Sequence, residues 1–172
     1  RSVQRAFEAV AVPTRIIDHF APLTYATALV LPGVGNFGYC ARQLHERQFD
    51  VLLRSTSQPI LGICVGMQLF FEGSDEADEP GLGLLRGRVE RLDCPHVGWD
   101  EVSGLGYVYF THHFGKTWYV RERNLTGVQF HPEKSGEVGL RFLREWAGSP
   151  STSSGSSLSG VPRADGQVLR TI

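Results

Sequence analysis

One cysteine of this sequence sits in a setting that suits a nucleophile. The segment Gly62-Ile63-Cys64-Val65-Gly66 lies between an apolar run and an amphipathic run. It is the cysteine counterpart of the G-x-S-x-G elbow, in which a sharp strand-to-helix turn exposes the nucleophile. The start of a helix favours the thiolate, and the N–H of Val65 would point at a developing oxyanion. A buried core cysteine is the alternative reading of Cys64.

A second short segment offers a base for this thiol. His131 and Glu133 lie two residues apart, after an apolar stretch. If residues 129–133 are extended, both side chains point to the same side of the chain. A histidine could then take the thiol proton while the carboxylate fixes its tautomer. With Cys64, this pair would be sufficient for acyl transfer through a thioester.

Other polar residues near these segments could line a pocket. Gln68 follows Cys64 by four residues and shares the helix face above the thiol. Met67 flanks the same pocket or fills the core. The pair His112-His113 lacks neighbouring ligands for a metal ion, so we predict no metal site; one of the two histidines could line the pocket.

The composition narrows the class of protein. The chain has 172 residues, with 17 basic and 18 acidic side chains, which gives no reason to expect a nucleic-acid or membrane partner. The cysteines Cys40, Cys64 and Cys94 form no C-x-x-C pair. This argues against a disulfide framework or zinc site and favours a reducing, cytoplasmic compartment.

Hydrophobic periodicity predicts the elements that must position these residues. Helical patterns cover residues 2–10, 37–53, 66–72 and 138–146. A short strand is expected at 14–17, and buried strands are expected at 26–31 and 59–63. Shorter strands are expected at 87–92, 107–111, 117–121 and 126–130. The alternation predicts an α/β fold, a mostly parallel sheet with flanking helices and additional short strands in the second half. We assign residues 1–147 to one domain and the Ser/Gly-rich residues 148–172 to a tail or linker.

These motifs resemble a known family. The segments PGVG (32–35), GICVGMQ (62–68) and QFHPE (129–133) are similar to those of class I glutamine amidotransferases. The segments LPGVGNFG, GLGLLRGRV, PHVGWD and GVQFHPEKS resemble the glutaminase subunits of imidazole glycerol phosphate synthase, in histidine biosynthesis. The resemblance spans residues 1 to 147 and implies a flavodoxin-like fold. The family begins with a central strand, and we expect that strand to be missing here.

The resemblance also implies a mechanism without metal or cofactor. The Cys64 thiolate would attack the side-chain amide of glutamine, and His131, held by Glu133, would move the protons. The oxyanion would be stabilised by N–H groups of Val65 and of the turn Gly33-Val34-Gly35. The residues expected around the substrate glutamine are Gln68, Met67, Glu76 and His112.

A partner follows from the same resemblance. In the family, ammonia passes to a separate (β/α)₈ cyclase subunit, which makes imidazole glycerol phosphate and an aminoimidazole carboxamide ribotide. We expect three residues at that interface: Pro95, Trp99 and Lys134. Trp99 could equally be a core residue. Two further interpretations stay open: a glutaminase component of another amidotransferase, and a truncated, catalytically inactive binding copy.

Overall fold

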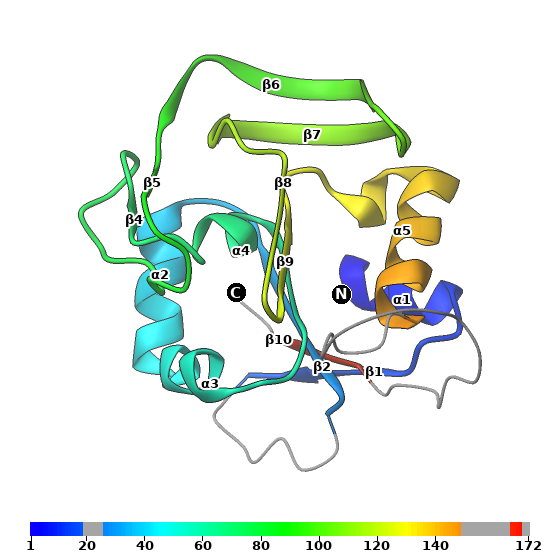
Figure 1. Cartoon of the computed structure of the whole chain (residues 1–172), viewed down its shortest axis with the longest axis horizontal. Coiled ribbons are helices and arrows are strands. Elements are labelled where there is room, and N and C mark those ends of the chain that lie inside the picture. Colours follow the sequence, from blue (N-terminus) through cyan, green and yellow to red (C-terminus); the bar gives the residue numbers. More distant parts are fainter. Residues whose placement is uncertain (19–25, 149–165, 170–172) are drawn as a thin grey trace.

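A parallel sheet forms the centre of the molecule. The computed structural model describes residues 1–18, 26–148 and 166–169. Within these ranges the main sheet has the order β1-β10-β2-β3-β9-β8, and only β8 runs antiparallel to its neighbour (Figure 1). Its strands are β1 (Thr14–Ile17), β2 (Ala28–Gly33), β3 (Ile60–Cys64), β8 (Tyr119–Glu122), β9 (Leu125–Val128) and β10 (Gly166–Leu169).

Helices cover both faces of this sheet, which confirms the predicted α/β class. They are α1 (Ser2–Ala9), α2 (Phe37–Glu46), α3 (Phe49–Ser55), α4 (Val65–Gln68) and α5 (Gly136–Gly148). Helices α1 and α5 lie on one side, where the rings of Phe7 and Trp146 meet edge to face at 6.1 Å, and α2 and α3 lie on the other (Figure 1). None of the helices in the described ranges has the length and apolarity needed to cross a bilayer.

Two predicted helices are wrong in length. The helix expected over 37–53 is split into α2 and α3, because Gln48 takes a left-handed conformation with φ of 59°. The helix expected over 66–72 ends after a single turn, at Gln68. There the carbonyls of Leu69 and Phe70 accept hydrogen bonds from Leu82 and Leu85, at 2.7 and 2.8 Å, instead of from the next helical turn.

The second half of the chain adds two smaller sheets. Strand β4 (Gly73–Ser74) pairs with β5 (Arg88–Val89), and β6 (Arg91–Val102) forms a long antiparallel ribbon with β7 (Gly106–Phe114) across the top of the main sheet (Figure 1). The strand expected over 87–92 is therefore divided between β5 and a much longer β6. Pro95, which has no N–H to donate, falls in the irregular stretch where the ribbon register shifts.

The predicted tail contributes to the main sheet. Within residues 148–172, Gly166–Leu169 forms β10, which pairs in parallel with β1 on one side and β2 on the other. The tail prediction is wrong for these four residues, and the central position expected to lack a strand is filled by them. Residues 149–165 and 170–172 lie outside the described residues, so the domain boundary at 147 stays a prediction.

Candidate functional site

Three loops with chemically useful residues meet at the carboxyl edge of the sheet. In the strand register Gly33 lies opposite Cys64, and Ile63 lies opposite Val128. The turn after β2, the elbow after β3 and the segment after β9 therefore leave the sheet side by side. Parallel α/β sheets bind ligands at this edge.

Cys64 occupies a strained elbow. Its φ of 54° and ψ of −116° are unusual for a residue with a side chain. The flanking glycines are needed sterically, as the sequence indicated. A Cβ on Gly66 would lie 1.8 Å from the Leu31 carbonyl oxygen, and one on Gly62 would lie 2.7 Å from the Met67 Cα.

His131 and Glu133 form a buried pair, but not on an extended segment as expected. Residues Pro132–Lys134 make a 3₁₀ turn with His131 at its N-cap, which brings His131 Nδ1 to 2.8 Å from Glu133 Oε1. The backbone of His131 is fixed on both sides. Its N–H donates to the Tyr109 carbonyl at 2.9 Å, and its carbonyl accepts from the Ser135 hydroxyl at 2.7 Å.

The surroundings of His131 favour its charged form. Burial lowers the pKa of this imidazole, but its interactions with the nearby Cys64 sulfur and the Glu133 carboxylate outweigh burial and raise the pKa to about 9. Nε2, the second ring nitrogen, is buried and makes no hydrogen bond within the described residues. At neutral pH the ring can therefore act as an acid beside a sulfur nucleophile.

A glutamine that the sequence analysis did not single out contacts Cys64. Gln129 Nε2 donates to Cys64 Sγ at 3.5 Å, and its Oε1 accepts from Gln68 Nε2 at 3.1 Å. Gln68 Nε2 also donates to the Phe114 carbonyl at 2.9 Å. The sequence signal for Gln129 was a polar side chain between Val128 and Phe130, since buried polar groups need partners.

A cavity of about 480 Å³ opens beside Cys64, a size that suits an amino-acid substrate. Most of the predicted site residues line it: Val34, Gly35, Cys64, Val65, Gln68, Glu76, His112, His131 and Lys134. Glu133 lies behind His131, and Gly33 sits under Gly66. Met67 is not on the cavity wall; it is buried and packs against Gly127, as the core interpretation required.

His112 faces the cavity as a neutral ring. Burial, followed by repulsion from His96, His131 and His113, lowers the pKa of His112 to about 4. Its Nδ1 is buried and has no hydrogen-bond partner among the described residues. No group of three or more acidic, histidine or cysteine side chains in the described ranges could hold a metal ion.

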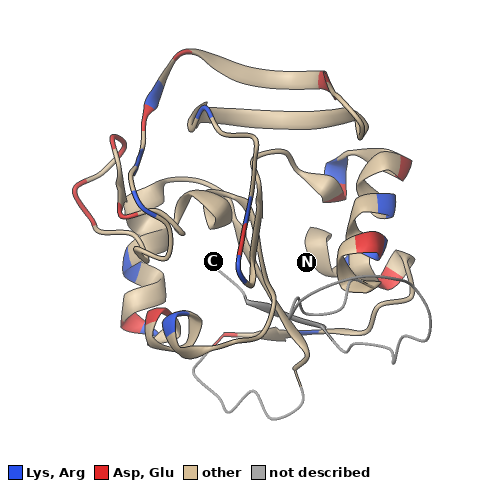
Figure 2. Ribbon diagram, viewed as in Figure 1, with Lys and Arg blue, Asp and Glu red and all other residues tan. Residues whose placement is uncertain are grey.

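The outer face of the β6–β7 ribbon carries several exposed apolar and aromatic side chains, together with Glu101 and Thr111. Trp99 is 56% exposed and packs edge to face on Tyr109, with ring centroids 6.0 Å apart, so the core alternative for Trp99 is wrong. Val97 and Tyr107 are exposed on the same face. Lys134 reaches from the cavity rim over the Tyr109 ring, at 5.7 Å. Charged residues lie towards the ends of this ribbon, and its middle is free of them (Figure 2).

Comparisons with known proteins identify what the chain is similar to. Residues 1–100 match the family described as glutamine amidotransferase class-I. Proteins described as imidazole glycerol phosphate synthase subunit HisH are similar over most of their length. The protein of Exiguobacterium sibiricum is 39% identical, covering 84% of this chain and 87% of that one, and the protein of Symbiobacterium thermophilum is 38% identical, covering 84% and 86%.

Solved structures share the fold. A crystal structure of a glutamine amidotransferase superposes with a TM-score of 0.64 at 21% identity, covering 87% of this chain and 94% of that one. A structure described as a GMP synthase component from Thermoplasma acidophilum gives 0.61 at 19% identity, covering 85% of each chain. The family match contains Cys64 but ends before His131 and Glu133, which the fold brings to it.

Proposed function

The chain belongs to the class I glutamine amidotransferases, and we propose that it is the glutaminase subunit of an imidazole glycerol phosphate synthase. Its reaction is the hydrolysis of glutamine to glutamate and ammonia. The observation that carries the proposal is the elbow at Cys64, which shares one cavity with His131, whose ring is hydrogen-bonded to Glu133 behind it. The identity to two proteins described as subunits of this synthase supports the same assignment.

The first half-reaction forms a thioester. The Cys64 thiolate attacks the side-chain amide carbon of glutamine, and negative charge develops on the amide oxygen. In this proposal the N–H groups of Val65 and of the turn Gly33-Val34-Gly35 stabilise that oxyanion; the lining of the cavity by Val34, Gly35 and Val65 supports it. The protonated His131 gives its proton to the departing nitrogen, the C–N bond breaks, and ammonia leaves.

The second half-reaction releases glutamate. Water attacks the thioester carbon while the now neutral His131 takes a proton from it. The C–S bond breaks, and the thiolate and imidazolium are restored together. Glu133 keeps the imidazole in the tautomer that leaves Nε2 facing the reaction. Gln68, Glu76 and the neutral ring of His112 provide polar contacts for the substrate around the cavity.

The ammonia is passed to a cyclase subunit, with which the chain forms a heterodimer. Ammonia released into neutral water would be protonated and lose the lone pair that makes it a nucleophile, so the cavity must open onto the acceptor. The exposed face with Trp99, Val97 and Tyr107 lies beside the cavity rim at Lys134 and suits such a partner. Pro95 is exposed at the start of this face. The free thiols Cys40, Cys64 and Cys94 favour the cytoplasm.

The deciding experiment replaces the nucleophile. Cys64→Ala should abolish glutamine hydrolysis measured with a (β/α)₈ cyclase subunit present, while Cys94→Ala, which removes an exposed thiol outside the cavity, should not. Glutamine hydrolysis retained in Cys64→Ala would contradict the assignment. Stimulation by the synthase partner of a different amidotransferase, but not by the cyclase, would replace the proposed partner.

A further inference from the structure

The turn that supplies the oxyanion donors is tied down by a carboxylate. Glu76 Oε2 accepts a hydrogen bond from the backbone N–H of Phe37 at 2.8 Å. Phe37 is the first residue of α2, which begins directly after Gly33-Val34-Gly35 and its N-cap Asn36. A bond from a helix N-terminus to a carboxylate is charge-assisted, so it restrains the turn more than a neutral bond would.

A second, weaker contact holds the same turn. Cys40 lies fully buried in α2, and its Sγ donates to the Val34 carbonyl at 3.7 Å. Burial raises the pKa of Cys40 to about 11, with the charges of Glu76 and Cys64 adding to the effect, so the thiol remains a donor. Thiol donors bind weakly. The carboxylate of Glu76 is therefore the stronger of the two restraints.

The backbone around Glu76 is fixed to strand β5. The Ser74 hydroxyl accepts from the Glu76 N–H at 3.1 Å and donates to the Val89 carbonyl at 3.4 Å. The Asp75 N–H donates to the same carbonyl at 2.9 Å. Ser74 and Asp75 are thus held directly to Val89 of β5, and the backbone of Glu76 is held to Ser74.

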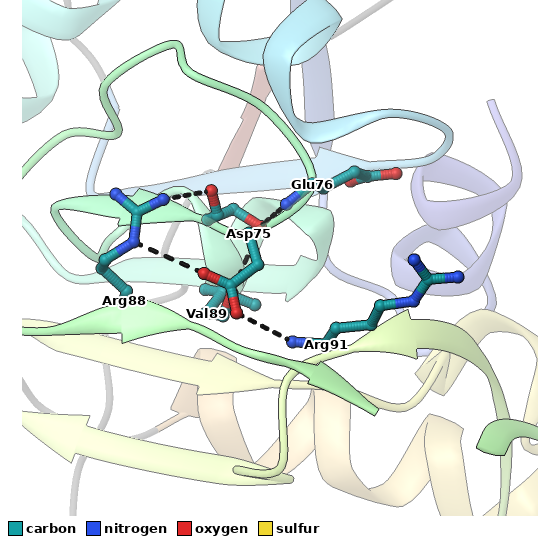
Figure 3. Close-up of polar contacts among 6 residues, drawn as sticks. Asp75, Glu76, Arg88, Val89 and Arg91 are labelled. Atoms are coloured by element: carbon teal, nitrogen blue, oxygen red, sulfur yellow. Dashed lines mark hydrogen bonds and ion pairs between the residues drawn. The ribbon is translucent and has the colours of Figure 1, made fainter. Parts of the chain in front are cut away.

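Two exposed charged side chains, Asp75 and Arg88, add further bonds to the segment Ser74–Glu76. Arg88 Nη2 donates to the Ser74 carbonyl at 2.6 Å, and Arg88 Nε lies 3.5 Å from Asp75 Oδ1 (Figure 3). Asp75 Oδ2 accepts from the backbone N–H of Arg91, the first residue of β6, at 3.3 Å. Gly73 leaves room for the Arg88 guanidinium, because a Cβ on residue 73 would lie 2.6 Å from Arg88 Nη1.

We propose that Asp75 and Arg88 are positioning residues for glutamine hydrolysis. They hold the segment Ser74–Glu76 so that the Glu76 carboxylate fixes the turn that stabilises the oxyanion. Neither residue lines the cavity at Cys64, so their effect passes through Glu76. The inference rests on the proposed glutaminase function and adds residues at the base of the β6–β7 ribbon to that site.

The test compares two variants with a matched control. Asp75→Ala and Arg88→Met should lower kcat for glutamine about three- to tenfold with the cyclase present, since the side chains are 46% and 57% exposed and such contacts are modest. KM should change less, because the oxyanion donors act only after attack. Arg91→Ala removes a neighbouring positive charge but keeps the backbone N–H, and its side chain points away from Asp75 (Figure 3). It should retain the kcat of the wild type.

Alkylation of Cys64 by iodoacetamide distinguishes a role in positioning the oxyanion turn from a general loss of structure at the site. Alkylation requires the Cys64 thiolate but forms no tetrahedral oxyanion. The rate at Cys64, followed by peptide mass spectrometry so that exposed Cys94 does not interfere, should stay within about twofold of the wild type in both variants. A purely structural role would lower turnover and alkylation together, and would also lower the melting temperature.

The outcomes are distinct. Unchanged kcat in Asp75→Ala and Arg88→Met, or a parallel loss of kcat and Cys64 alkylation, overturns the positioning role and leaves the glutaminase assignment intact. An equal loss in Arg91→Ala also overturns it, because charge alone would then explain the effect. A wild-type chain that hydrolyses no glutamine with the cyclase overturns the proposed function and the positioning role with it.

Discussion

His131 Nδ1 lies 2.8 Å from Glu133 Oε1, and the two side chains are only 2% and 5% exposed. The pair is carried by a 3₁₀ turn whose ends are anchored to β7 and to Ser135. A carboxylate this close and this buried stabilises an imidazolium far more than one at the surface. It thus favours the protonated form of His131 beside Cys64.

Replacing Glu133 should therefore damage catalysis more than substrate binding. Glu133→Gln keeps the shape of the side chain but removes its charge, so the imidazolium loses its partner and the tautomer is no longer fixed. We expect kcat for glutamine to fall by about 10²–10⁴-fold with a much smaller change in KM. Steady-state kinetics with the cyclase would measure this. Glu90→Gln, which disturbs only an exposed pair with Lys116, should behave as wild type.

The same histidine should make stability depend on pH. The pKa of His131 is about 9 in the folded chain and about 6.5 in an unfolded one. Below pH 6.5 both states are protonated, and the stabilisation is fully present. It is lost as pH rises towards 9, because the unfolded chain releases its proton first. The advantage of wild type over His131→Asn in urea unfolding should shrink by roughly 3 kcal/mol between pH 6 and pH 9.5. A difference that does not vary with pH would contradict this.

Local sequence patterns were sufficient to predict those parts of the site whose residues all come from one short segment. The elbow at Cys64 was predictable because glycines at both sides are needed by the backbone itself. The strands before Gly33 and Cys64 were predictable because they are buried on both faces and are apolar throughout.

Contacts between distant segments were not predictable from pattern. Helix α4 is short because Leu82 and Leu85 take the carbonyls that would have continued it. Gln129, just after β9, contacts Cys64 at the end of the neighbouring strand β3, and β10 joins the sheet through pairings with residues more than a hundred positions away. Nothing local to any of these segments encodes its partner.

Gly66 should not tolerate a side chain. The Cβ of Gly66→Ala would lie 1.8 Å from the Leu31 carbonyl oxygen, so β2 and the elbow would have to separate. We expect a loss of at least about 3 kcal/mol and a melting temperature lower by roughly 6–12 °C. Gly148→Ala, at the end of α5 with no atom within 4 Å of the added carbon, is the matched control for thermal melts. Equal melting temperatures for the two variants would contradict the tight packing at the elbow.

Removing β10 should weaken the whole sheet. A chain ending at residue 165 would leave the facing edges of β1 and β2 without their hydrogen-bonded neighbour. Since each lost backbone hydrogen bond costs about 1 kcal/mol, we expect a total loss of several kcal/mol in urea unfolding. A chain ending at Leu169 keeps β10 and should unfold like the full chain. Equal stability of the chains ending at 165 and 169 would show that β10 contributes nothing.

Trp99 should matter for association and not for folding. Its side chain is 56% exposed and packs only on the outer face of the ribbon, against Tyr109. Aromatic residues at the centre of an interface commonly contribute about 2 kcal/mol or more, so Trp99→Ala should weaken binding to the cyclase by about 30-fold or more. Titration calorimetry would measure the affinity. Trp118→Ala removes another exposed tryptophan, 44% exposed and outside this ribbon, and should bind normally. If both variants lose affinity equally, or neither does, the β6–β7 face is not the docking surface.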